Sequence, residues 1–189
     1  HGFLKGIRIF DEDEIAARTD LRDSPIVTID GENARDFDDA VFVGKTNSHY
    51  ELFVSIADVA HYVKPATALD QEAYSRGTSV YFPDRAIPML PEALSNGICS
   101  LNPNEDRLTK TVAMEINGKG EVVRSRFFNS VIRSSKRMTY TVVRRILVDQ
   151  DPEHLERYRD LVDQFKLMQA LALLMYESRR SRGNLDFDL

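Results

Sequence analysis

Four aspartates, Asp30, Asp36, Asp38 and Asp39, lie within ten positions and are the residues of this chain best suited to chemistry. Carboxylates at this spacing repel one another, which raises some of their pKa values unless a cation neutralises them. Mg²⁺ suits such a cluster, because it prefers oxygen ligands and typically takes one or two carboxylates together with waters and substrate phosphate. Two metal ions about 3.5–4 Å apart can clamp the attacking and leaving oxygens of a phosphodiester. The residues alone leave two interpretations open, a metal site and a solvated acidic turn.

Other metal chemistries fit this chain badly. A calcium-binding EF-hand that began at Asp30 would need a glycine at its sixth position and a glutamate at its twelfth, where the sequence has Arg35 and Val41. Cys99 is the single cysteine, which excludes an internal disulfide and a cysteine-based metal cluster. Because Cys99 lies in an apolar segment, we expect it to pack in the core. The four histidines show no paired spacing, and we interpret His61 as structural.

Strands are expected on both sides of the aspartates. Runs rich in β-branched and aromatic residues, bounded by turn residues, predict strands. These runs are 26–29, 40–45, 50–57, 78–82, 109–116 and 122–131. The first two flank the aspartates, which therefore fall at a strand end, in a loop and at the next strand start. Turn residues at 46–48 and 117–120 predict that two pairs of neighbouring strands form hairpins.

Capping residues and helical periodicity predict helices around these strands. Thr67 opens a capping box for a helix over 68–76, and Gly77 closes it. Further helices are expected at 12–18, at 139–147 and, as one long amphipathic element, at 152–183. Alternation at 185–189 predicts the start of another strand. The predicted fold class is therefore α+β, with a mixed, mostly antiparallel sheet and surrounding helices.

The composition is that of an ordinary globular chain, with 42% hydrophobic and 29% charged residues among 189. The sequence contains neither a run of eighteen apolar residues nor a signal peptide. We therefore expect a cytoplasmic location and no membrane partner. The chain begins without Met, and we interpret it as a fragment of a longer protein.

Charge is distributed unevenly along the chain. The net charge of −5 does not indicate nucleic-acid binding, but residues 119–145 hold eight basic side chains against one acidic side chain, Glu121. A basic block can follow phosphates, while the acidic loop holds metal ions against them. One chain that carries both suggests a phosphodiester substrate. The alternative is that the basic residues solvate the outer faces of strands.

Several ordered motifs resemble the ribonuclease II/ribonuclease R family of processive 3′→5′ exoribonucleases, and the ribonuclease R branch fits best. The likeness runs from about residue 24 to the C-terminus. The motifs are 28–40 (TIDGENARDFDDA), 56–63 (IADVAHYV), 76–83 (RGTSVYFP), 87–91 (IPMLP) and 94–103 (LSNGICSLNP). The resemblance strengthens the hydrolase interpretation over the acidic turn.

The resemblance implies roles for the four aspartates, which match the family's metal-site residues in spacing. Asp30 and Asp39 would ligate magnesium most directly, and Asp36 would act through hydrogen bonds or water. Asp38 would be the residue whose loss most impairs hydrolysis, through a second metal ion or the attacking water. Manganese could substitute for magnesium.

Two tyrosines are implicated by the same resemblance. Tyr81 matches a tyrosine that stacks near the 3′-terminal nucleotides, and Tyr140 matches one that contacts RNA near the cleavage end. Stacking on aromatic side chains holds single strands at about 1–3 kcal/mol per base. From the sequence alone, both tyrosines could instead be packing residues.

The resemblance also implies parts that this sequence does not contain. The family's catalytic domain is about twice as long, and a catalytic arginine and glutamate lie in its second half. Cold-shock and S1 domains flank it in the family. We therefore divide the chain into residues 1–23, a leading segment or linker from an upstream domain, and residues 24–189, the N-terminal part of an incomplete catalytic domain of the ribonuclease II type. Alone, we expect it to be weakly active or inactive.

The sequence thus predicts part of a Mg²⁺-dependent processive 3′→5′ exoribonuclease that converts single-stranded RNA to nucleoside 5′-monophosphates. Asp30, Asp36, Asp38 and Asp39 are its predicted catalytic and metal-binding residues, and Tyr81 and Tyr140 its RNA-binding residues. The alternative is a non-catalytic RNA-binding or regulatory protein that keeps the fold. A third possibility is a magnesium-dependent phosphatase or DNA nuclease with a convergent aspartate loop.

Overall fold

The computed structural model describes residues 11–46 and 48–183. Its helices are α1 (Glu12–Ala16), α2 (Val59–Tyr62), α3 (Ala68–Arg76), the π-helix η1 (Ala93–Ile98), α4 (Tyr140–Leu147), α5 (Pro152–Arg157) and α6 (Arg159–Ser181). Its strands are β1 (Thr19–Asp20), β2 (Val27–Asp30), β3 (Asp39–Lys45), β4 (Tyr50–Ala57), β5 (Val80–Tyr81), β6 (Ala86–Ile87), β7 (Asp106–Ile116), β8 (Val122–Arg133) and β9 (Lys136–Thr139).

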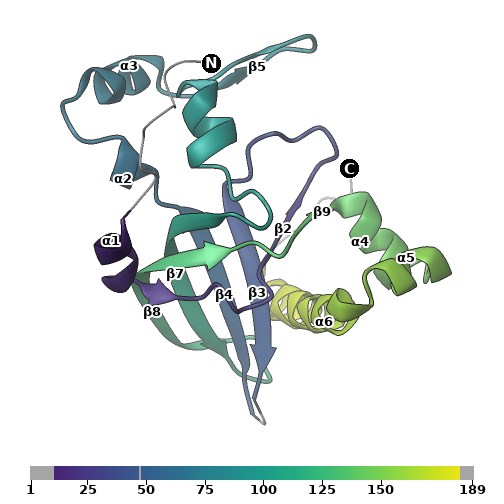
Figure 1. The fold of residues 1–189 in the computed structure, drawn as a ribbon. Helices are drawn as coiled ribbons and strands as arrows, with labels where there is room; N and C mark the ends of the chain where they lie inside the picture. The colour runs from purple at the N-terminus through teal and green to yellow at the C-terminus, as the bar shows by residue number, and fades with distance from the viewer. Residues whose placement is uncertain (1–10, 47, 184–189) are drawn as a thin grey trace.

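One seven-stranded sheet organises the described chain, in the order β1-β8-β7-β4-β3-β2-β9. The pairs β1–β8 and β2–β9 are parallel, and the pairs between them are antiparallel. Figure 1 shows α2, α3 and β5 at the same end of the sheet as the loop between β2 and β3. The structure therefore confirms the predicted α+β class with a mixed, mostly antiparallel sheet.

Helix α6 covers one face of the sheet beside β3. Its buried Phe165 packs with Val27 of β2 and Met138 of β9. Further along the same helix, Leu171 packs with Val43 and Ile116. Burial of these apolar side chains is the main favourable contribution to folding on this face.

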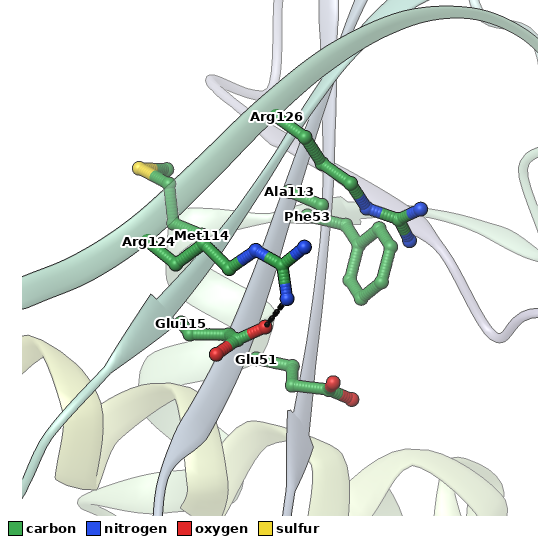
Figure 2. Close-up of a pocket in the computed structure, with 7 residues that line it drawn as sticks. All are labelled: Glu51, Phe53, Ala113, Met114, Glu115, Arg124 and Arg126. Atoms are coloured by element: carbon green, nitrogen blue, oxygen red, sulfur yellow. Dashed lines mark ion pairs between the residues drawn. The ribbon is translucent and has the colours of Figure 1, made fainter.

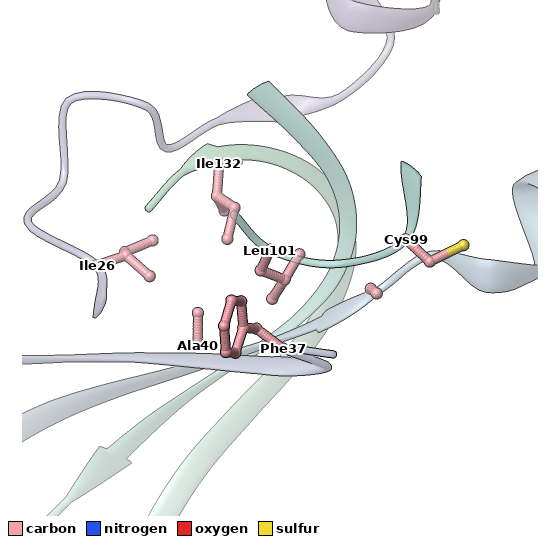
Figure 3. Close-up of a cluster of buried hydrophobic side chains, with 7 residues drawn as sticks. Ile26, Phe37, Ala40, Cys99, Leu101 and Ile132 are labelled. Carbon is pink, nitrogen blue, oxygen red and sulfur yellow. The ribbon is translucent and has the colours of Figure 1, made fainter. Parts of the chain in front are cut away.

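The opposite face holds a second core, which lies beneath the aspartate loop. Ile26, Phe37, Ala40 and Leu101 pack there (Figure 3). Cys99 belongs to the same cluster and is buried, which confirms its expected place in the core. The burial of Cys99 raises its pKa to about 11, so the thiol stays protonated and poorly nucleophilic at neutral pH.

A cavity opens on this second face, away from the aspartate loop. Phe53, Glu115, Arg124 and Arg126 line a cavity of about 260 Å³ there (Figure 2). Arg124 lies 3.7 Å from Glu115, and the Arg126 guanidinium lies 5.0 Å from the Phe128 ring centroid. These two members of the basic block therefore sit on a mixed-charge surface.

The structure differs from the predicted elements in several places, and the short elements β1, β6 and α2 were not predicted. The expected strand at 78–82 is reduced to the two-residue β5. The long helix expected at 152–183 is broken at Tyr158, whose backbone φ of −115° and ψ of 23° leave the helical region. This break lets α5 pack against α4 while α6 lies on the sheet. The short strand β9 was not predicted, and the predicted strand at 185–189 lies outside the described residues.

No helix in residues 11–46 and 48–183 is long and apolar enough to cross a membrane.

Replacing Arg22 by methionine tests the ion pairs that fasten β1 to the sheet. Arg22 contacts Asp20 at 2.6 Å and Asp106 at 3.1 Å. Its hydrogen bonds lower the pKa of Asp20 to about 2, so this contribution to stability is complete above about pH 4 and is lost as the pH falls toward 2. Arg22→Met should lower the melting temperature by a few degrees near neutral pH, and the difference should shrink in acid. Circular dichroism melts across this range measure it, and an equal difference at pH 2 would contradict the assignment.

Candidate active site

Phe37 anchors the aspartate loop to the protein interior. Its backbone N–H donates to Ser100 Oγ at 3.0 Å, and its carbonyl accepts from the Leu101 N–H at 2.8 Å. Because side chains alternate along extended backbone, burying Phe37 turns Asp36 and Asp38 to the other side. The Ala57 N–H also donates to the Asp38 carbonyl at 2.9 Å, which ties the loop to β4.

Asp36 and Asp38 face a cavity of about 380 Å³ at the end of the sheet. The other residues around it are Ile56, Ala57, Val59, Ser79, Tyr81, Met89, Leu90, Ser95 and Cys99. A second cavity of about 340 Å³ adjoins it and shares Asp36, Ser79, Tyr81 and Ser95. The structure therefore places Tyr81, which is 71% exposed, on the same cavity as two of the predicted catalytic aspartates.

Asp30 and Asp39 lie at the adjoining ends of β2 and β3. Burial raises the pKa of Asp30 above its usual value, and the Asp39 carboxylate raises it further, while Arg137 partly offsets both. The Asp30 Oδ2 atom is buried and has no hydrogen-bond partner. A buried carboxylate oxygen without a partner is energetically costly, so Asp30 is suited to receive a cation.

Asp38 shows the same kind of perturbation. The residue is exposed to solvent, yet partial desolvation of its carboxyl group raises its pKa, and Asp36 and Asp39 add to the increase. The four aspartates therefore act on one another, although only two of them line the cavity.

The acidic cluster fits Mg²⁺ better than a metal held only by protein. In residues 11–46 and 48–183, no group of three or more histidine, cysteine, aspartate or glutamate side chains is arranged to hold a metal ion. Mg²⁺ does not need such a cage, because it is usually bound through one or two carboxylates and keeps several waters. The unpartnered oxygen of Asp30 and the repulsion among the aspartates both favour such an ion.

Arg137 of β9 holds the loop from the other side. Its Nη2 atom donates to the carbonyls of Gly31 at 3.1 Å, Glu32 at 2.8 Å and Ala34 at 3.5 Å. Its guanidinium lies 5.1 Å from the Phe37 ring centroid, within the range of a cation–π interaction. Arg137 belongs to the basic block at 119–145, and its role was not predicted, since nothing local connects it to residues about a hundred positions earlier.

Tyr140 lies on the β9 side of the loop. The parallel pairing of β2 with β9 sets Asp30 opposite Thr139, and Tyr140 follows as the first residue of α4. Its side chain is 65% exposed, so it is available for contact, but it does not line the cavity that contains Tyr81. Hydrogen bonding to Thr141 lowers the pKa of Glu32, which also links the loop to α4.

Comparison with known proteins defines the class of protein to which this chain belongs. The family model for the RNB domain matches residues 18–189. The chain therefore belongs to the RNB domain family, which confirms the predicted resemblance and its fold.

Within this family, the chain is similar to ribonuclease R. Ribonuclease R of Escherichia coli (strain K12) is 48% identical over 178 residues, which cover 94% of this chain and 22% of that protein. Ribonuclease R of Thermotoga maritima is 53% identical over 171 residues, which cover 90% of this chain and 24% of that protein. The structure of Mycoplasma genitalium RNase R in complex with double-stranded RNA matches with a TM-score of 0.86 and 33% identity, over 94% of this chain and 32% of that one. The chain thus spans less than a quarter of the length of these two curated relatives.

Replacing Arg137 tests its hold on the loop. Arg137→Leu removes hydrogen bonds from a charged donor. We expect it to lower the free energy of unfolding by about 1.5–3 kcal/mol, the contribution of one such bond. Arg137→Lys keeps the charge but loses the planar fork, so we expect an intermediate loss. Urea denaturation measures both.

Arg124→Leu provides the matched control, because Arg124 is an exposed arginine whose surface ion pair is worth less than about 1 kcal/mol. Equal losses from Arg137→Leu and Arg124→Leu would show that Arg137 does not hold the loop.

Proposed function

We propose that this chain forms part of a Mg²⁺-dependent, processive 3′→5′ exoribonuclease that hydrolyses single-stranded RNA to nucleoside 5′-monophosphates. The observation that carries the proposal is the cavity shared by Asp36, Asp38 and Tyr81, next to the buried, unpartnered oxygen of Asp30. Carboxylates for a metal ion and an exposed ring for a base are the two components that such an enzyme requires at one place. Membership of the RNB domain family and similarity to ribonuclease R support the same activity.

The aspartates divide the work according to their surroundings. Asp30 and Asp39, at adjoining strand ends, would hold the ion directly, and Asp36 would orient its waters. When bound, Mg²⁺ supplies electrostatic stabilisation for the charge that develops on the phosphodiester oxygens. Asp38 would contribute to the metal site and orient the attacking water, whose proton a carboxylate with a raised pKa can accept.

The tyrosines would hold the 3′ end of the strand on two sides of the loop. Tyr81 would stack on a base at the cavity, and Tyr140 would contact the chain beside Asp30. Stacking works with any base because every base has a π-face, which suits an enzyme that moves along RNA without regard to sequence. Solved RNase R structures with double-stranded RNA and with ribose-methylated single-stranded RNA support an RNA substrate.

A Mn²⁺ titration separates this proposal from a non-catalytic RNA-binding protein. The chain should bind Mn²⁺, followed by electron paramagnetic resonance, and Asp30→Asn and Asp38→Asn should each weaken binding at least about tenfold. Asp163→Asn is the matched control, because Asp163 is an exposed acid of α6 that pairs with Lys166 and lies outside the four-aspartate cluster. Binding that none of the four aspartates affects would favour the non-catalytic alternative.

Cleavage assays test the activity itself. In a protein as long as the ribonuclease R relatives, Asp38→Asn should abolish release of 5′-nucleotides from labelled single-stranded RNA, because the carboxylate that orients the attacking water is lost, while RNA binding persists. The 189-residue chain alone should release them weakly or not at all. Unchanged turnover of the variant would remove Asp38 from the mechanism. Equal cleavage of DNA or of small phosphoesters would favour the phosphatase or DNA nuclease alternative.

A further inference from the structure

A buried ion pair lies outside the cavity, where the segment before β2 meets the central strands. Arg18 Nη2 contacts Asp58 Oδ2 at 2.8 Å, and each side chain is only 4% exposed. Arg18 also pairs with Glu14 at 2.8 Å. Its Nη1 atom donates to the carbonyls of Thr109 in β7 and Ser130 in β8 at 3.3 and 3.5 Å.

Stability alone explains such a pair poorly. Removing two charges from water costs much of what their attraction returns, so a buried ion pair is often no more stabilising than apolar side chains of similar volume. Arg18 links the α1–β1 segment to both β7 and β8. A precisely held side chain at this junction therefore calls for a second role.

Asp58 connects this pair directly to the aspartate loop. It follows Ala57, whose N–H donates to the Asp38 carbonyl at 2.9 Å, and its own N–H donates to the Leu108 carbonyl at 2.9 Å. Ala57 and Asp38 line the same cavity. A shift of Asp58 would therefore move the peptide that fixes the backbone of Asp38.

We propose that Arg18 and Asp58 are positioning residues that set the place of Asp38 in the cavity. The proposal rests on the proposed function for its consequence in catalysis. The chain of contacts runs from the guanidinium of Arg18 to the carboxylate of Asp58, then through the neighbouring Ala57 amide to the Asp38 carbonyl. Misplacement of a catalytic group by about 1 Å can cost about a hundredfold in rate. An ion pair that fixes the backbone next to Asp38 would therefore protect the rate of the reaction.

The Ala57 amide gives a test that needs neither metal nor RNA. In Arg18→Met and in Asp58→Asn, hydrogen exchange at this amide, followed by NMR, should accelerate several-fold more than exchange at the amides of β7. Arg22→Met is the matched control, because Arg22 pairs with Asp20 of β1 and Asp106 of β7 but makes no ion pair with Asp58. It should change the Ala57 and β7 amides equally. Equal acceleration in Arg18→Met would overturn the proposal.

Mn²⁺ affinity gives the second readout. Arg18→Met and Asp58→Asn should each weaken Mn²⁺ binding by about tenfold, as loss of groups that orient metal ligands does, while Arg22→Met should leave it unchanged. Arg18→Lys should restore part of the affinity, and it replaces Arg18→Met in both measurements if the methionine variant fails to fold.

These measurements separate the two proposals. Variants that melt at lower temperature yet bind Mn²⁺ as tightly as wild type would show that the ion pair is structural only. A wild-type chain without a Mn²⁺ site at the aspartates would refute the proposed function, and exchange at the Ala57 amide would still decide whether Arg18 and Asp58 position Asp38.

Discussion

Carboxylates of like charge have to be held close together in the loop between β2 and β3, and residues distant in the sequence hold them. Phe37 is buried and hydrogen-bonded on both sides of its backbone by Ser100 and Leu101. Arg137 bonds three carbonyls of the same loop. Burial, and then repulsion from the neighbouring carboxylates, raises the pKa values of Asp30 and Asp38, and these contacts offset the cost of holding the acids there. The apolar core below the loop is therefore as necessary to the site as the acids above it.

Local patterns predicted most of the elements that position this site. The hairpin of β3 and β4 and the hairpin of β7 and β8 follow from alternating apolar runs around short turns. The helix α3 (Ala68–Arg76) is capped by Thr67 and Gly77, as predicted. Spacing within one short stretch was also enough to choose the four aspartates as candidate site residues, because they lie close together in the sequence.

What the sequence did not predict depends on contacts between distant segments. The strand β9 is four residues long and partly charged, and it forms because it pairs with β2. Arg137 has a role only once that pairing exists. The break at Tyr158 likewise follows from packing of α5 against α4, since the apolar periodicity continues across it. The same holds for the buried pair of Arg18 and Asp58, which forty positions separate.

The parallel pairing of β2 with β9 has a consequence for how the protein is made. Gly31 and Arg137 are 106 positions apart, so a ribosome that adds about 5–20 residues per second needs about 5–20 seconds to pass from one to the other. During that interval the nascent polypeptide carries the acids without the strand that organises them. The loop can therefore make its contacts with Arg137 only after translation has passed β9, late in the synthesis of this segment.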